Sequence, residues 1–397
     1  MDILRRLFPG LIGVIFLWVV LTTVCWAADE IVIGVIHWKD FAYAEMMKNS
    51  YDMAAEAINA DGGINGQPLK LITADDGGSR RGGEQAVDKL IKDHGAVMLI
   101  GGYSSSNTLY TARAADRHEV PFLVTTAADD RITQRGLKNV FRLNPPASAY
   151  TNGLEAFMLE KVRPRSMAIV YENSPYGTSG AMKMMWFGRE NDIELTAIIP
   201  YFRERAGQDY FDRILKPLKT SAPDVIYMVS YLKDAVQLVT KIREISTKAL
   251  LCGGAGGFTH YKFIEQADAT GDGLVTAALW GPETDFAGAR AYYDAYMARF
   301  DNPPDYHGAE AYSAVLVAAE ALKNARDHEP ASIRTALGRI EMETPFGPVQ
   351  FDSDATFERQ NWIDTLVFQI ADNQFRCIWP EPLATRPFTP PTYWRSE

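Results

Sequence analysis

Short apolar runs alternate with stretches of helical periodicity along this chain, and this alternation restricts the possible folds more than any other feature. A first series of apolar runs predicts buried strands at 31–36, 69–74, 97–100 and 121–124. After Asn144 a second series predicts strands at 167–171, 195–200, 225–229, 249–252 and 274–279. Strands joined by helices form right-handed βαβ units and parallel sheets. The sequence therefore predicts an α/β protein with two doubly wound parallel-sheet lobes.

The last third of the chain predicts that each lobe is visited more than once. Helices are expected at 289–299, 309–325 and 331–337, followed by hairpin strands at 345–351, 365–370 and 375–378. The proline-rich tail at 387–397 is expected to be extended on the surface.

The N-terminal segment has the three parts of a secretory signal. Two arginines precede an apolar run at 11–21, and Cys25-Trp26-Ala27 resembles an Ala-x-Ala cleavage site. We expect residues 1–27 to be a signal peptide cleaved near Ala27, with the mature protein in the periplasm. A lipid anchor on Cys25 is an alternative, opposed by Val24 where a small residue is required. An uncleaved membrane anchor is another, opposed by the shortness of the apolar run.

Composition and charge argue against a nucleic-acid-binding protein. The 397 residues suffice for two domains, and 50 acidic against 40 basic residues give a net charge of −10. An acidic chain without a basic stripe is a poor nucleic-acid binder. The mature chain keeps Cys252 and Cys377, expected to be free buried thiols, although export would permit a disulfide.

The usual enzyme motifs are absent from the sequence. It contains no G-x-S-x-G, Walker A, H-E-x-x-H or paired C-x-x-C pattern, and its six histidines lack metal-ligand spacing. His37 and His260 are expected to be surface or capping residues. We therefore expect neither an enzyme nor a metal or cofactor site.

Two neighbouring predicted strands end in small, hydroxyl-rich loops. Gly101-Gly102 and the serines at 104–106 follow the first strand, and the sequence at 125–128 follows the second. A helix beginning at the serines would offer unpaired N–H groups and partial positive charge to an anion. The carboxyl edge of a parallel sheet is a common place for a ligand. Ordinary helix capping would explain either loop alone, but the succession of both favours a ligand site.

Several motifs follow one another as they do in the type I periplasmic binding proteins, and the chain resembles the leucine/isoleucine/valine-binding branch that serves ABC importers. The motifs are INADGGINGQPLKL (58–71), IGGYSSSNT (100–108), VTTAADDRITQRG (124–136), VFRLNPP (140–146), SPYGTSG (174–180), PDVIYMVSY (223–231) and TPFGPVQFD (344–352).

The resemblance implies two lobes joined by three crossovers that close on a ligand. It places the N-terminal lobe at 30–143 plus 277–357 and the C-terminal lobe at 144–276 plus 358–397. It also implies a monomer that binds a small molecule and delivers it to an ABC permease in the inner membrane. An exported sensor that presents ligand occupancy to a receptor or kinase is the alternative.

The resemblance also implies ligand-binding residues in the first lobe. Ser105 would hold a carboxylate through its hydroxyl and N–H groups, and Thr126 and Ala128 would contribute backbone groups. Tyr43 would form an aromatic wall, which Trp38 or Phe41 could replace or supplement.

In the second lobe, Tyr176 and Tyr231 occupy the positions of ring-bearing residues of the cleft. Ala255 lies in the loop at 253–257, where amino-acid binders of this family place an acid for the ligand ammonium. This loop reads Gly-Gly-Ala-Gly-Gly, so it is expected to leave space and no counter-charge.

Ala128 also replaces a threonine that usually binds both ends of an amino acid. An uncharged, larger or aromatic ligand, such as a carboxylate or amide, is therefore favoured. An amino acid stays open, with Glu310 or Asp234 as the acid.

Overall fold

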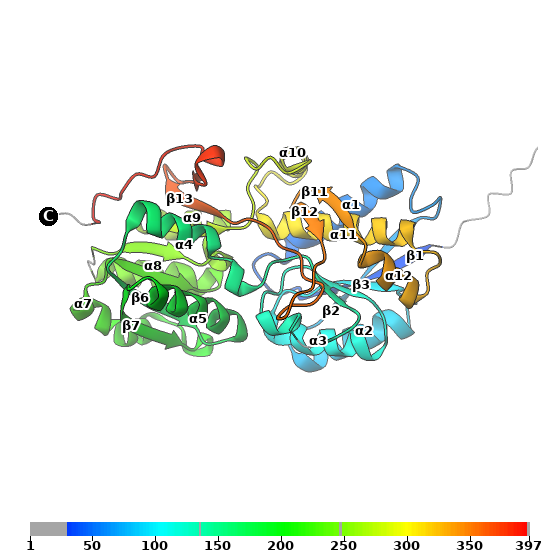
Figure 1. Cartoon of the computed structure of the whole chain (residues 1–397), viewed down its shortest axis with the longest axis horizontal. Coiled ribbons are helices and arrows are strands. Elements are labelled where there is room, and N and C mark those ends of the chain that lie inside the picture. The colour runs from blue at the N-terminus through cyan, green and yellow to red at the C-terminus, as the bar shows by residue number, and fades with distance from the viewer. Residues whose placement is uncertain (1–29, 135, 246–247, 395–397) are drawn as a thin grey trace, which may run out of the picture.

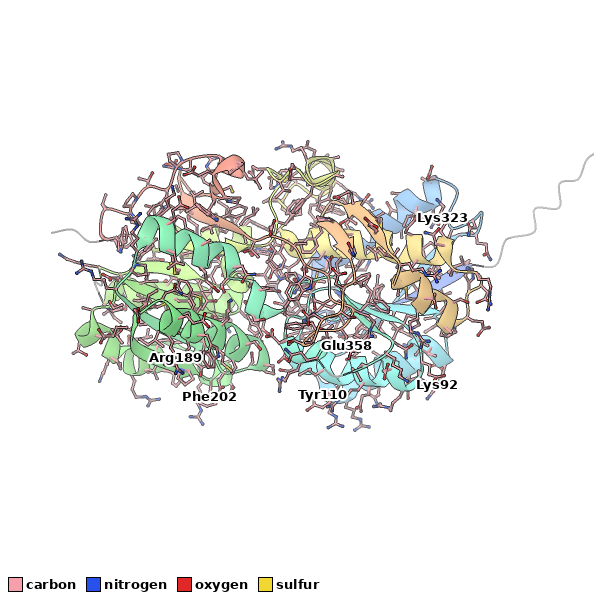
Figure 2. The ribbon with its side chains drawn as sticks, viewed as in Figure 1. Lys92, Tyr110, Arg189, Phe202, Lys323 and Glu358 are labelled. Carbon is pink, nitrogen blue, oxygen red and sulfur yellow. The ribbon has the colours of Figure 1, made fainter. Side chains whose placement is uncertain are left out.

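A computed structural model describes residues 30–134, 136–245 and 248–394, and the expected signal peptide at 1–27 lies outside these residues. Two lobes lie side by side, with helix α10 over their junction (Figure 1). Figure 2 shows Lys92 and Lys323 on the outer surface of one lobe and Arg189 and Phe202 on that of the other. No helix among these residues combines the length and apolar character that a membrane crossing requires.

The first lobe is built on a five-stranded sheet in the order β2-β1-β3-β4-β5, and every pairing is parallel. Its strands are β1 (Ile31–His37), β2 (Leu69–Asp75), β3 (Met98–Gly101), β4 (Phe122–Val124) and β5 (Val140–Arg142). Its helices are α1 (Ala44–Ala60), α2 (Arg80–Lys92), α3 (Ser105–Arg117), α11 (Tyr306–Asn324) and α12 (Pro330–Leu337). The buried runs of β3 and β4 agree with a sheet covered on both faces. Helix α11 returns from late in the chain and packs against α1.

The second lobe is built on a seven-stranded sheet in the order β14-β13-β10-β9-β8-β6-β7. Its strands are β6 (Ser166–Glu172), β7 (Glu194–Tyr201), β8 (Val225–Val229), β9 (Leu250–Gly253), β10 (Val275–Ala278), β13 (Leu366–Ala371) and β14 (Gln374–Trp379). Its helices are α4 (Asn152–Phe157), α5 (Pro175–Glu190), α6 (Gln208–Ile214), α7 (Lys216–Ser221), α8 (Leu232–Glu244) and α9 (Tyr261–Ala267). The C-terminal strands β13 and β14 pair antiparallel, and the others are parallel.

The chain passes between the lobes after β5, after β10 and after the hairpin of β11 (Glu341–Thr344) and β12 (Gly347–Gln350). Helix α10 (Ala289–Phe300) follows the second passage. The expected division at 276/277 falls inside β10. Two mainly parallel sheets confirm the predicted α/β fold class. Late in the chain, helix α11 returns to the first lobe and strands β13 and β14 return to the second sheet.

Three details refine the sequence-based expectations. Strand β5 was not predicted, because it has only three residues and includes Arg142, so it forms no apolar run. The proline-rich tail runs along the surface, as expected, and Trp394 anchors it. This side chain is buried, and its Nε1 donates to the carbonyl of Asp224 at 3.2 Å. Cys252 and Cys377 are free, buried thiols, as expected.

Candidate functional site

The predicted site residues meet at a small cavity between the lobes, at the carboxyl ends of strands from both sheets. Five of the seven predicted residues line this cleft cavity: Ser105, Thr126, Ala128, Tyr176 and Tyr231. Tyr103, Tyr150, Gly256, Tyr306 and His307 complete the lining. The cavity has a volume of about 20 Å³, which suits roughly one water molecule. The two lobes are therefore closed on one another.

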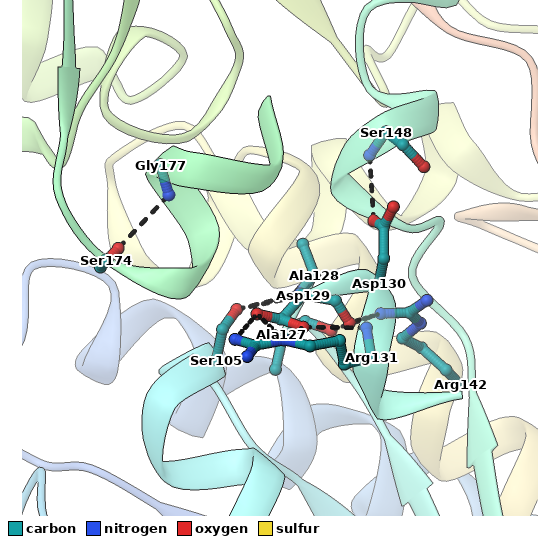
Figure 3. Close-up of polar contacts among 10 residues, drawn as sticks. All are labelled: Ser105, Ala127, Ala128, Asp129, Asp130, Arg131, Arg142, Ser148, Ser174 and Gly177. Atoms are coloured by element: carbon teal, nitrogen blue, oxygen red, sulfur yellow. Dashed lines mark hydrogen bonds and ion pairs between the residues drawn. The ribbon is translucent and has the colours of Figure 1, made fainter. Parts of the chain in front are cut away.

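Ser105 fixes the loop that follows β4. Its Oγ accepts hydrogen bonds from the backbone N–H groups of Ala128 at 3.2 Å and Asp129 at 3.1 Å (Figure 3). A hydroxyl oxygen accepts through its lone pairs, so the hydroxyl proton of Ser105 stays available for another acceptor. Ser105 is also the first residue of α3, where N–H groups lack intrahelical acceptors. The predicted convergence of hydroxyl and helix start is thus present.

A buried arginine supports the same loop from behind. Arg142, fully buried in β5, donates to the carbonyl oxygen of Asp129 at 2.7 Å and to that of Ala127 at 3.5 Å (Figure 3). Burial lowers the pKa of Arg142 to about 10, which still leaves the guanidinium charged at neutral pH. The loop therefore has a fixed backbone, as a binding site needs.

Close packing of β3 on β1 explains the glycine pair before α3. Gly101 has φ +111°, and a Cβ there would lie 2.2 Å from the carbonyl oxygen of Ile36. The carbonyl oxygen of Gly102 accepts hydrogen bonds from the N–H groups of Thr126 and Ala127. A Cβ at Gly102 would lie 3.0 Å from the Thr108 side chain and 3.3 Å from that of Phe122, so side chains at this turn would press on β1, α3 and β4.

Tyr43 joins the lobes and does not line the cleft cavity. Its side chain is buried, and its hydroxyl donates to the carbonyl oxygen of Gly256 in the second lobe at 2.9 Å. Its ring stacks on His307 with a centroid distance of 3.8 Å and meets the edge of His260 at 4.7 Å. Phe41 stacks on Tyr103 at 3.9 Å and extends this aromatic wall. Tyr43 therefore acts as a contact between the closed lobes.

The glycine-rich loop at 253–257 leaves no space, contrary to expectation. A Cβ at Gly256 would lie 2.2 Å from the Tyr176 hydroxyl oxygen, and one at Gly254 would lie 2.3 Å from that of Tyr227. The Tyr176 hydroxyl donates to the Gly254 carbonyl oxygen at 3.1 Å. Aromatic side chains of other elements thus fill the volume that the glycines lack. Ala255 is fully buried, and its neighbour Gly256 is the residue of this loop that reaches the cleft cavity.

Tyr176 and Tyr231 stand at helix starts of the second lobe. Ser174 accepts from the N–H of Gly177 at 3.3 Å and caps α5, with Pro175 in the first turn (Figure 3). Tyr231 precedes α8, and its ring lies 5.4 Å from that of Tyr176. The two rings therefore form one wall of the cleft cavity.

Glu310 is a buried acid that contacts the loop after β4. Its Oε2 accepts a hydrogen bond from the Thr126 hydroxyl at 2.8 Å, whereas its Oε1 is buried and has no hydrogen-bond partner among the described residues. Burial raises the pKa of Glu310 well above its ordinary value. Glu310 lies behind Thr126, outside the lining of the cleft cavity. Asp234 is also buried, and burial raises the pKa of its carboxyl group too.

Four lining residues were not predicted from the sequence: Tyr103, Tyr150, Tyr306 and His307. Tyr306 and His307 begin α11, which returns to the first lobe from late in the chain. The tyrosine after the glycine pair, Tyr103, was the clearest signal available in sequence. His260 caps α9 by accepting from the N–H of Lys262, as expected. Among the residues that the structure describes, no cluster of His, Cys, Asp and Glu could hold a metal ion.

A family model described as periplasmic binding protein matches residues 32–373. Leu/Ile/Val-binding protein homolog 7 of Brucella suis is 26% identical over 353 residues, covering 84% of this chain and 86% of that protein. Homolog 8 of Brucella abortus is 25% identical over 357 residues, covering 84% and 85%.

Solved structures share the fold. The branched-chain amino acid transporter substrate-binding protein LivJ from Streptococcus pneumoniae, in complex with isoleucine, superposes with a TM-score of 0.79 at 21% identity, covering 87% of this chain and 98% of LivJ. A solute-binding protein from R. palustris in complex with benzoate superposes with a TM-score of 0.76 at 17% identity, covering 92% of this chain and 99% of that protein.

Proposed function

Because the chain belongs to the periplasmic binding protein family, whose members are non-catalytic substrate-binding proteins of transporters, we propose that it captures a small organic carboxylate for an ABC importer. The observation that carries this proposal is the meeting of Ser105 at the start of α3 with tyrosines of both lobes around one cavity. The ligand would lie between the lobes and hold them closed.

The first lobe supports the anionic end of the ligand. The N-terminus of α3 offers N–H groups and partial positive charge. The Ser105 hydroxyl has a proton to donate, because its oxygen already accepts from two N–H groups. A carboxylate oxygen at this place would receive charge-assisted hydrogen bonds.

Aromatic side chains support a flat ligand body. Tyr103, Tyr150, Tyr176, Tyr231 and Tyr306 line the cleft cavity from several elements. Aromatic rings pack favourably against one another in offset or edge-to-face arrangements. A benzoate-like carboxylate therefore suits this lining, and one structural relative was solved with benzoate.

The described lining offers no charged partner for an α-ammonium group. Backbone carbonyls of the 253–257 loop already accept from Tyr43 and Tyr176. The pKa of Glu310 is raised by burial, so this carboxyl group favours its neutral form. A buried ammonium without a counter-charge costs several kcal/mol. We therefore propose that benzoate-type acids bind more tightly than leucine or valine.

Binding requires movement, since about 20 Å³ holds none of these ligands. Separation of the lobes would break the hydrogen bond from Tyr43 to Gly256 and move the Tyr43 ring away from His260. Hinge closure of this kind is common in proteins that bind solutes between domains.

Parallel calorimetric titrations of the mature protein with leucine, valine, phenylalanine and benzoate test the ligand class. We expect benzoate to bind with micromolar or lower Kd and the aliphatic amino acids to bind at least tenfold more weakly. Micromolar leucine binding with inert benzoate would contradict the proposal and indicate that Glu310 supplies the missing acid.

The proposed location is the periplasm, with delivery to an inner-membrane permease by a monomer. N-terminal sequencing of exported protein should give a start at or near Ala28. An intact Met1 or a lipidated Cys25 would contradict cleavage near Ala27.

A further inference from the structure

A second cavity, here called the aromatic cavity, shares a lining residue, Tyr306, with the cleft cavity. Its volume of about 320 Å³ falls in the range of small-molecule sites. The walls come from α9, the end of β10, α10, the loop before α11 and the turn between β13 and β14. Six aromatic side chains line it: Tyr261, Trp280, Tyr293, Tyr306, Phe368 and Phe375. Tyr306 is the residue that the two linings have in common.

The aromatic cavity contains a buried carboxylate with an unused oxygen. Asp305 lines the cavity and is only 8% exposed. Its Oδ1 accepts from the backbone N–H of His307 at 2.9 Å and lies 3.0 Å from Nδ1 of that residue. Its Oδ2 is buried and has no hydrogen-bond partner among the described residues. Oδ2 is closed off from the cavity in this side-chain orientation. Buried polar atoms without partners are rare and unfavourable, so a rotation of the carboxyl group that turns Oδ2 toward a donor in the cavity would be favourable.

The remaining charges favour a cation over an anion. Glu283 is exposed and Arg376 half-buried, and both line the aromatic cavity. The lining thus contains two carboxylates and one guanidinium group. Aromatic faces also attract cations through their negative π surfaces. The ring of Trp280 is held in place, because its Nε1 donates to the carbonyl oxygen of Pro345 at 2.7 Å.

We propose that the aromatic cavity is a second ligand site, which takes an organic ammonium ion with an aromatic body. The Asp305 carboxyl group turns so that Oδ2 accepts from the ammonium group, and the ring packs among the aromatic side chains near Phe375. This site uses other residues than the anion-binding start of α3. The proposal therefore stands or fails independently of the ligand proposed for the cleft cavity.

The probe is 2-phenylethylammonium, titrated calorimetrically into the mature protein, with 3-phenylpropionate as a similar molecule of opposite charge. We expect the ammonium probe to bind. Phe375→Ala should weaken its binding at least tenfold, because Phe375 lines only the aromatic cavity of the two. Ser105→Ala should change the Kd of the ammonium probe less than twofold.

Two charge variants test the orientation of the ligand. Asp305→Asn should weaken the ammonium probe at least tenfold, while asparagine can still cap α11. Arg376→Met should strengthen the same probe severalfold by removing a like charge, and this variant does not alter a helix cap.

Three results would overturn the proposal. The first is no binding of the ammonium probe. The second is binding that Ser105→Ala abolishes and Phe375→Ala leaves intact, which would place the probe in the cleft cavity. The third is tighter binding of 3-phenylpropionate that Arg376→Met abolishes, which would assign the aromatic cavity to an anion.

Discussion

Replacing Ser105 with alanine separates two roles of one hydroxyl group. In the folded protein its Oγ accepts from the N–H groups of Ala128 and Asp129, and both residues are buried. A buried N–H group left without an acceptor costs about 1–3 kcal/mol. The cleft cavity of about 20 Å³ admits one water molecule, which can satisfy one of the two groups. We therefore expect Ser105→Ala to lower the free energy of unfolding by about 2 kcal/mol.

The same substitution should weaken ligand binding through the lost hydroxyl proton. One good hydrogen bond contributes about 1–2 kcal/mol, which corresponds to a rise in Kd of about 5–30-fold. Urea unfolding measures the stability effect, and calorimetry on the folded variant measures the affinity. Ser104→Ala is the matched control, because Ser104 makes no capping hydrogen bond through its side chain.

Two results would contradict these expectations, one for stability and one for ligand binding. An unfolding free energy equal to that of Ser104→Ala would show that the loop does not depend on Ser105. An unchanged Kd would remove the Ser105 hydroxyl from the ligand site, even if the stability falls as expected.

Three further predictions concern the cleft and its buried titratable groups. Gly256→Ala should weaken ligand binding and destabilise the closed lobes, since its Cβ would lie 2.2 Å from the Tyr176 hydroxyl oxygen. Calorimetry measures the effect, with Gly77→Ala as the control, because Gly77 has a similar positive φ and open space around it. Equal effects of the two substitutions would contradict the steric argument. Because burial raises the pKa of Glu310 above its ordinary 4.5, the free energy of unfolding should fall as pH rises above 4.5. Glu310→Gln should reduce the slope of unfolding free energy against pH, measured by urea titrations at pH 5–8. An unchanged slope would show that Glu310 is ionised without cost. Burial lowers the pKa of His260 from 6.5 to about 4, so stability present above pH 6.5 should be lost toward pH 4, with a limiting slope of about 1.4 kcal/mol per pH unit. His260→Asn, which can still cap α9, should reduce that acid-side slope, and identical acid unfolding of the two proteins would refute the assignment.

The sequence was informative about the two loops that follow β3 and β4, although Tyr103 in the first of them was not predicted. Ser105 and Thr126 follow consecutive parallel strands, so their meeting at one sheet edge follows from βαβ geometry. Tyr306 and His307 could not be found in this way. They lie at least 180 residues after Thr126 in the chain, and the packing of α11 against α1 brings them to the cleft.

The glycine-rich loop shows the limit of local reasoning in another form. Five small residues indicate where side chains are missing, but they do not indicate which neighbours fill the volume. Here Tyr176 and Tyr227 fill it from α5 and β8. The tail gives the same lesson, since the burial of Trp394 depends on a surface that its own sequence does not describe.

The late return of β13 to the larger sheet sets an order in which the two sheets can be completed during synthesis. All five strands of the first sheet are present once residue 142 has been made, whereas β10 receives its antiparallel neighbour only with residues 366–371. Until then β10 is an edge strand with unpaired N–H and C=O groups, a known template for pairing between chains. Fragments that end between β10 and β13 should therefore aggregate more readily than those that include the final hairpin.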